Sequence, residues 1–138
     1  MSTLKTDLRV RDVMMGLDAI PVVREKTLFK EVMEAMSKHR LGIACIVDGD
    51  GRLVGVFTDG DLRRILLRDQ KPFAALFVDD AVRHAHTNPT TVDENMNLAD
   101  AIEVMEDKQV WDLPVVDGDR RLLGLLHLHP AIKAVLGM

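Results

Sequence analysis

The chain has 138 residues, of which 47% are hydrophobic and 29% are charged, and its formal net charge is −4 at pH 7. Charges of both signs are interspersed, which argues against a nucleic-acid or anionic-membrane surface, because both partners need clustered Lys and Arg. One cysteine, Cys45, excludes an internal disulfide, and no apolar run approaches the ~20 residues of a membrane span, so we expect a cytoplasmic domain.

The first predicted helix covers "FKEVMEAM" (residues 29–36), where apolar residues recur with the spacing of one helix face and Thr27 or Leu28 precedes the first turn. Two strands follow, "IACIV" and "RLVGVF", joined by the acidic turn "DGDG". We expect these strands to pair antiparallel and, because they are apolar almost throughout, to be buried on both faces. A second helix follows over "LRRILL" (residues 62–67).

The same pattern returns 69 residues later, so the chain contains an internal repeat. "LADAIEVM" (residues 98–105) corresponds to the first helix, with Asn97 as its expected N-cap. "PVVDGDRRLLG" corresponds to the strand pair, and "AIKAVL" (residues 131–136) to the second helix. The register assigns repeat 1 to residues 8–68, a linker to 69–78 and repeat 2 to 79–137.

The stretch "GVFTDGDLRR" (residues 55–64) lies where a strand passes into a helix. Thr58 and Asp61 fit a helix cap, since a hydroxyl at the N-cap and a carboxylate three residues later satisfy backbone N–H groups. The equivalent positions in repeat 2 are His127 and Pro130, so the same turn forms without that pair. This asymmetry favours a ligand-binding role for Thr58 and Asp61, with simple capping as the alternative.

Two β-α-β-β-α units, the first ending its last strand in "GVFTDGD", resemble a tandem pair of CBS domains, also called a Bateman module. Within that family, "RDVM", "KHRLG", "GRLVGVFTDGDLRR" and "LLGLLHLH" resemble the C-terminal regulatory part of D-arabinose-5-phosphate isomerases. The resemblance implies an α+β fold whose repeats are related by a pseudo-twofold axis and which pairs into a flat dimer. It also implies an N-terminal sugar-isomerase (SIS) domain for which this chain has no room, so we interpret the chain as a regulatory fragment that is not catalytic alone.

The resemblance also suggests the ligand-binding residues. A carboxylate can accept hydrogen bonds from two vicinal hydroxyls, so Asp61 suits a ribose, and the Thr58 hydroxyl beside helix N–H groups suits a phosphate. CBS domains clamp the base with backbone groups that here correspond to two segments, and nearby cations are candidates for phosphate or a sugar acid. The residues implied are Ile20, Pro21 and Val22, Gly42, Ile43 and Ala44, and the cations His39, Arg40, Arg63 and Arg64.

Histidine pairs occur at "HAH" (His84 and His86) and "HLH" (His127 and His129), where i, i+2 spacing can place both imidazoles on one strand face. No C-x-x-C motif or evident carboxylate partner accompanies them, so we expect no metal and treat His127 and His129 as possible second-repeat ligand contacts.

Taken together, these features predict a regulatory module, a homodimer or tetramer, that senses a nucleotide or nucleotide-sugar for an isomerase of Kdo and lipopolysaccharide biosynthesis. The candidate effectors are CMP-Kdo, as the pathway's end product, and AMP or ATP as adenine nucleotides, with no cofactor required. A scaffold that binds no ligand and only sets the enzyme's oligomeric state is the alternative.

Overall fold

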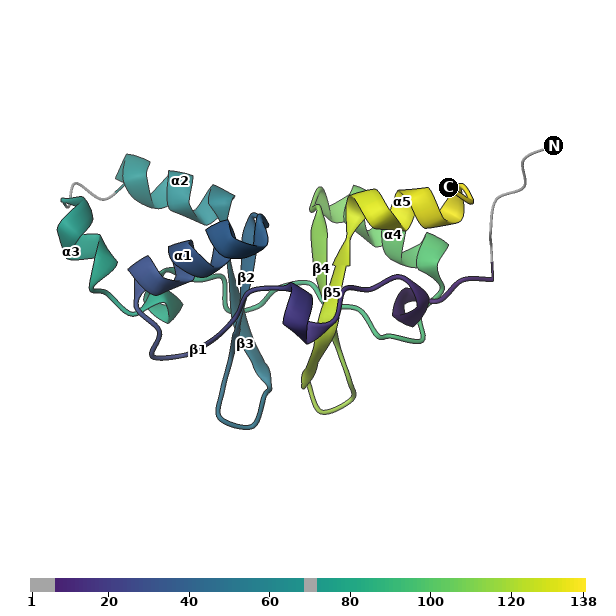
Figure 1. Cartoon of the computed structure of the whole chain (residues 1–138), viewed down its shortest axis with the longest axis horizontal. Helices are drawn as coiled ribbons and strands as arrows, with labels where there is room; N and C mark the ends of the chain where they lie inside the picture. The colour runs from purple at the N-terminus through teal and green to yellow at the C-terminus, as the bar shows by residue number, and fades with distance from the viewer. Residues whose placement is uncertain (1–6, 69–71) are drawn as a thin grey trace. The chain divides into compact units, whose positions relative to one another are not determined.

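The computed structural model describes residues 7–68 and 72–138, with the side chain of Phe73 excepted, and its backbone forms two compact units (Figure 1). One unit is Asp18–Pro89. The other combines the segment that ends at Leu17 with Thr90–Met138. The boundaries of the two units therefore differ from those of the sequence repeats, because the segment that ends at Leu17 folds together with repeat 2.

The first unit contains a three-stranded sheet in the order β1-β2-β3. Strand β1 (Val22–Arg24) runs parallel to β2 (Ile43–Val47), and β2 pairs antiparallel with β3 (Leu53–Thr58). All five residues of β2 are buried, as its continuous apolar sequence predicts.

Helices α1 (Phe29–His39) and α2 (Asp59–Arg68) accompany this sheet, and Figure 1 shows the acidic hairpin turn at the end of β2 and β3 away from them. The helix predicted at residues 29–36 and the antiparallel strand pair are thus confirmed. A short helix, α3 (Phe73–Phe77), lies within the predicted linker of residues 69–78, of which 69–71 are outside the described part. The 3-10 helix Ala81–His84 follows it.

The core of the first unit is centred on Phe29, whose side chain is 1% exposed. Its ring meets Phe57 edge-on at 5.1 Å and stacks on Phe77 at 6.2 Å between ring centroids. The other buried residues of this cluster come from α1, β2, α2, α3 and the 3-10 helix Ala81–His84: Val32, Met36, Ala44, Ile46, Ile65, Leu76 and Ala81.

The second unit contains the antiparallel pair β4 (Asp112–Val116) and β5 (Leu122–His127), with helices α4 (Leu98–Lys108) and α5 (Leu128–Val135). The Asn97 side chain accepts the Ala99 N–H at 2.9 Å, which confirms the predicted N-cap of α4. The counterpart of β1 is reduced to one parallel bridge between Val92 and Val115.

The segment before Leu17 is part of this second unit. Val10 is fully buried in the core of repeat 2, and its N–H donates to the Met96 carbonyl at 2.9 Å. Met15 and Leu125 exchange a pair of backbone hydrogen bonds at 2.8 and 3.0 Å, which adds an extended segment beside β5. The 3-10 helix Val10–Asp12 lies between these two attachments.

Candidate functional site

Thr58 and Asp61 form a reciprocal capping box where β3 passes into α2. The Thr58 N–H and hydroxyl both donate to Asp61 Oδ2, at 2.9 and 3.0 Å, and the Asp61 N–H donates to Thr58 Oγ1 at 3.2 Å. These bonds satisfy backbone donors that the first turn of a helix otherwise leaves free. The two residues that the sequence singled out are therefore in direct contact.

Arg64 completes this group from the next turn of α2. Its Nη2 donates to Asp61 Oδ1 at 2.6 Å, while the Asp61 side chain is 13% and the Arg64 side chain 63% exposed. A carboxylate offers about four lone pairs, so the three bonds leave one acceptor position on Oδ1. One ligand hydroxyl can donate there directly, whereas two vicinal hydroxyls would have to displace Arg64.

Gly42 and Ile43 lie beside the capping box. The Asp59 N–H donates to the Gly42 carbonyl at 3.0 Å, and a Cβ at position 42 would lie 2.6 Å from Asp59 Oδ2. Ile43 pairs with Thr58 in the β2–β3 register. Any side chain at position 42 would therefore clash with Asp59, the first residue of α2.

The other base-contact candidates lie along the same sheet. Ile20 and Pro21 are buried, the Pro21 carbonyl accepts the Cys45 N–H at 2.9 Å, and Val22 pairs with Cys45. The parallel register directs the residues before Val22 toward the sheet end where Ile43 meets Thr58. The Ala44 side chain is fully buried, so that residue can offer a ligand only backbone groups.

The predicted cations differ in their placement. Arg64 belongs to the capping box, whereas Arg63 is exposed on α2. His39 is the last residue of α1, and Arg40 follows it with a left-handed φ of 55°. Over residues 7–68 and 72–138, no hydrogen bond or ion pair joins His39, Arg40 or Arg63 to Thr58 or Asp61.

Repeat 2 places different chemistry at the equivalent position. His127 Nδ1 lies 2.7 Å from Asp112 Oδ1, and the two residues face each other across β4 and β5, as Ile43 and Thr58 do in repeat 1. Burial raises the pKa of Asp112, and the hydrogen bond with His127 acts against that rise. Asp112 is not among the residues predicted from the sequence, although the repeat register combined with hairpin pairing places it opposite His127.

The structure places neither histidine pair on one strand face. His127 ends β5, whereas His129 is an exposed residue of α5. His84 lies in a 3-10 helix with its Nε2 3.1 Å from Asp79 Oδ2, and His86 follows in a loop that pairs with Val56. In the part of the chain that the structure describes, no three His, Cys, Asp or Glu side chains are grouped as metal ligands.

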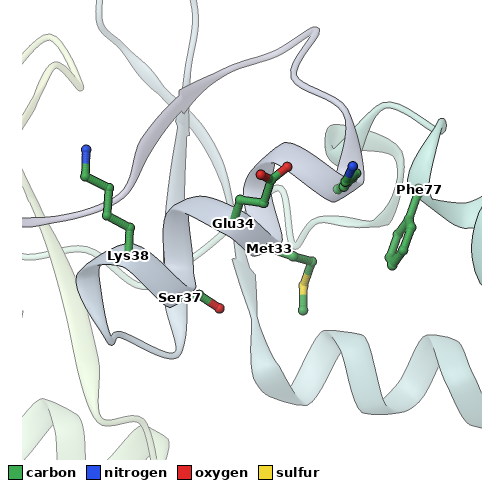
Figure 2. A pocket seen from close by; sticks show the side chains of 6 residues that line it. Met33, Glu34, Ser37, Lys38 and Phe77 are labelled. Carbon is green, nitrogen blue, oxygen red and sulfur yellow. The ribbon is translucent and has the colours of Figure 1, made fainter.

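A shallow pocket of about 570 Å³ lies elsewhere, on the outer face of α1. Figure 2 shows Met33 and Phe77 beside it, with Glu34, Ser37 and Lys38 along the helix. None of the predicted ligand-binding residues lines this pocket.

Among the described residues, no helix has both the length and the hydropathy that crossing a membrane requires.

The comparisons with known proteins agree on the fold. The family model of the CBS domain matches twice, at residues 10–68 and 78–136. Two structures of CBSX2, one in complex with AMP and one described as from Arabidopsis thaliana, match with TM-scores of 0.81 at 26% and 25% identity. The first covers 94% of this chain and 96% of that chain, the second 96% of each.

The chain is also similar to arabinose 5-phosphate isomerases named KdsD. It is 35% identical to the Pseudomonas aeruginosa protein over 127 residues, which is 92% of this chain and 38% of that protein. It is 30% identical to the Escherichia coli protein, again over 92% of this chain and 37% of that one. The chain thus spans little more than a third of these relatives. Since the CBS model matches twice over most of its length, the chain belongs to the CBS domain family and is a tandem pair of CBS domains.

Proposed function

We propose that the chain is the ligand-sensing regulatory module of an arabinose-5-phosphate isomerase. Relatives with that name align over nearly all of this chain but extend well beyond it. The remainder of such a protein would supply the SIS catalytic domain, and this CBS pair would form a homodimer or tetramer in the cytoplasm and be inactive alone.

The observation that carries the sensing role is the unused acceptor position on Asp61. The carboxylate is held by three hydrogen bonds at a strand-to-helix junction and keeps one lone pair on Oδ1. Repeat 2 has Pro130 at the equivalent position, so its helix starts without such a carboxylate. A ribose hydroxyl that donates to Asp61 would account for the difference between the two repeats.

An adenine nucleotide is the first candidate effector, because the CBSX2 structure, at 26% identity, was determined in complex with AMP. ATP belongs to the same class. CMP-Kdo is the second candidate, since an end product of the pathway would regulate its committed enzyme. In either case the base would be bound by backbone groups of Ile20–Val22 and Gly42–Ala44.

The second candidate function is a scaffold that binds no ligand. The capping box favours the scaffold, because each hydrogen bond of Thr58 and Asp61 described above is made with another group of the protein. In that case Asp61 only stabilises the start of α2, and the module acts by setting the oligomeric state of the enzyme.

Calorimetric titration of the wild type, Asp61→Ala and Pro130→Ala with AMP, ATP and CMP-Kdo separates the two functions. For a sensor, Asp61→Ala should weaken the ligand roughly 10- to 150-fold, the equivalent of one charge-assisted hydrogen bond of about 1.5–3 kcal/mol. Pro130→Ala, the matched position in repeat 2, should leave the affinity unchanged.

The scaffold predicts a different result. None of the three compounds would then shift the melting midpoint of the wild type, whereas a ligand at a hundredfold excess over its Kd stabilises by about 2.7 kcal/mol. Asp61→Ala would still lower stability by about 1 kcal/mol through loss of the cap. A variant that melts earlier yet binds normally would remove Asp61 from the binding site.

A further inference from the structure

The guanidinium of Arg64 lies beside the capping box of repeat 1. Its Nη2 donates to Asp61 Oδ1 at 2.6 Å. A Cβ at position 60 would lie 3.4 Å from Nη1 and 3.6 Å from Nη2 of Arg64, and 3.6 Å from Thr58 Oγ1. Because position 60 is a glycine, the guanidinium can fold back over the first turn of α2. It therefore occupies the space next to the carboxylate that the proposed function assigns to a ligand hydroxyl.

Most of the hydrogen-bonding capacity of Arg64 is unused. A guanidinium has five N–H donors, and over residues 7–68 and 72–138 the structure shows one hydrogen bond from this side chain, to Asp61. The Arg64 side chain is also 63% exposed, against 13% for Asp61. Thr58 holds the carboxylate in place through two further bonds, whereas an exposed arginine can change rotamer without disturbing the core. Arg64 is thus the partner that can leave Asp61 when a second anion is near.

This arrangement is specific to one position of the chain. Within the described residues, Arg63, the neighbouring cation on α2, is exposed and shares no hydrogen bond with Asp61. In repeat 2 the register places Pro130 and Lys133 at the positions of Asp61 and Arg64, so that helix has no carboxylate there for a cation to occupy. An exposed i, i+3 ion pair adds little to stability. Competition for Asp61 is therefore the distinctive consequence of the Arg64 bond.

We propose that Arg64 makes this site selective for anionic ribosides, by exchanging Asp61 for the phosphate of the ligand. The inference rests on the proposed sensing function and adds the class of ligand that the site accepts. Ribose hydroxyls compete with Arg64 for Asp61 Oδ1, and a ligand phosphate gives the displaced guanidinium a new partner in bidentate geometry. After the exchange, the carboxylate and the guanidinium each keep a hydrogen-bond partner.

The candidate effectors meet this requirement, since AMP, ATP and CMP-Kdo each carry a ribose and a phosphate. Adenosine and cytidine have the same bases and the same vicinal hydroxyls but no anion. A nucleoside that displaced Arg64 would gain the Asp61 bond and leave the guanidinium without a protein or ligand partner. The selection therefore depends on the charge of the ligand and is independent of its base.

Calorimetric titration with AMP and adenosine, and with CMP and cytidine, tests the exchange on the wild type, Arg64→Ala and Arg63→Ala. In Arg64→Ala the nucleotides should bind about tenfold more weakly, because the phosphate has lost its guanidinium partner. The nucleosides should bind about three- to tenfold more tightly, because Oδ1 is no longer occupied. Arg63→Ala removes the same charge from the adjacent residue and should change each Kd by no more than about threefold.

The opposite directions of the two changes identify the exchange. If Arg64 only supports the start of α2, Arg64→Ala will weaken nucleotides and nucleosides alike. If it only attracts phosphate, the nucleosides will bind as they do to the wild type. Either result would overturn the exchange while the sensing function stands.

Circular dichroism checks that Arg64→Ala folds, which we expect because the bonds between Thr58 and Asp61 do not involve Arg64. A wild type that binds neither AMP nor CMP would also overturn the exchange. The titrations with ATP and CMP-Kdo described above would then decide the sensing function separately.

Discussion

At the scale of single residues, the pair Asp112–His127 shows how one position of the repeat acquired a different chemistry. In repeat 1 the same cross-strand pair is Ile43 and Thr58, which places an apolar side chain beside a hydroxyl. In repeat 2 a carboxylate and an imidazole meet at 2.7 Å, with side chains only 13% and 26% exposed. Such a half-buried pair makes stability depend on pH.

The sign of that dependence follows from the raised pKa of Asp112, which burial causes. A carboxyl group whose pKa is higher in the folded state contributes its stability below the ordinary value of 3.8, and this contribution is lost as pH rises through the raised pKa. Asp112→Asn removes this titration. The stability of the wild type relative to Asp112→Asn should therefore fall as pH rises from below 3.8 through the raised pKa of Asp112.

Urea titrations of both proteins across that range measure the difference, and the other carboxyl groups cancel because both proteins contain them. A difference between wild type and Asp112→Asn that does not vary with pH, or that grows as pH rises, would contradict the argument.

At the scale of secondary-structure elements, the segment before Leu17 is attached to β5 through a close backbone approach at Gly124. A Cβ there would collide with the Met15 carbonyl oxygen and lie 3.2 Å from the Met14 sulfur. Gly124→Ala should therefore displace the segment and break the hydrogen bonds that the Arg9 and Arg11 side chains donate to Asn95, which frees the backbone at these arginines. Trypsin should then cleave after these arginines several-fold faster than in the wild type, because cleavage follows the population of the open form.

Hydrogen exchange provides the second measurement. The amides of Val10 and Met15 should lose protection in Gly124→Ala, while those of β2 and β3 should keep it. Gly118→Ala is the matched control, since a Cβ there meets nothing within 4 Å. If protection at Val10 and Met15 survives in Gly124→Ala, the backbone has absorbed the added methyl group and the attachment does not depend on glycine.

At the scale of the whole molecule, the two units differ in chain continuity. The core of one unit comes from a single continuous segment, whereas the core of the other comes from two segments. Residues 18–89 include all of the hydrogen-bonded sheet β1-β2-β3 and the Phe29 cluster. Residues 90–138 lack Val10 and the backbone partners of Leu98 and Leu125, which come from the first 17 residues. The first fragment should therefore fold alone, and the second should not.

Far-UV circular dichroism and urea titration of the two separate fragments check this expectation. A synthetic peptide of residues 7–17 added to fragment 90–138 should restore its secondary structure, because it returns the buried Val10 side chain and the missing hydrogen bonds. Cooperative unfolding of 90–138 without the peptide would show that the N-terminal segment is dispensable.

Much of this architecture could be predicted from local patterns. The helix at Phe29, the cap at Asn97 and both hairpins were predictable because their signals lie within a few residues of one another. The contact between Thr58 and Asp61 was predictable for the same reason, since a capping box spans three residues. The left-handed conformations of Arg40, Gln109 and Arg120 were not, because these residue types do not mark positive φ as glycine does.

By itself, the sequence determined the duplication, the order of helices and strands within each repeat and the asymmetry between Asp61 and Pro130, since each is a matter of residue type and spacing. Only the tertiary structure decided three long-range relations. It placed Val10 in the core of repeat 2, set Asp112 against His127 and gave the Asp61 carboxylate a third hydrogen bond, from Arg64. The first two depend on how distant segments pack and pair, and the third on which rotamer a long exposed side chain adopts, which spacing along the chain does not encode.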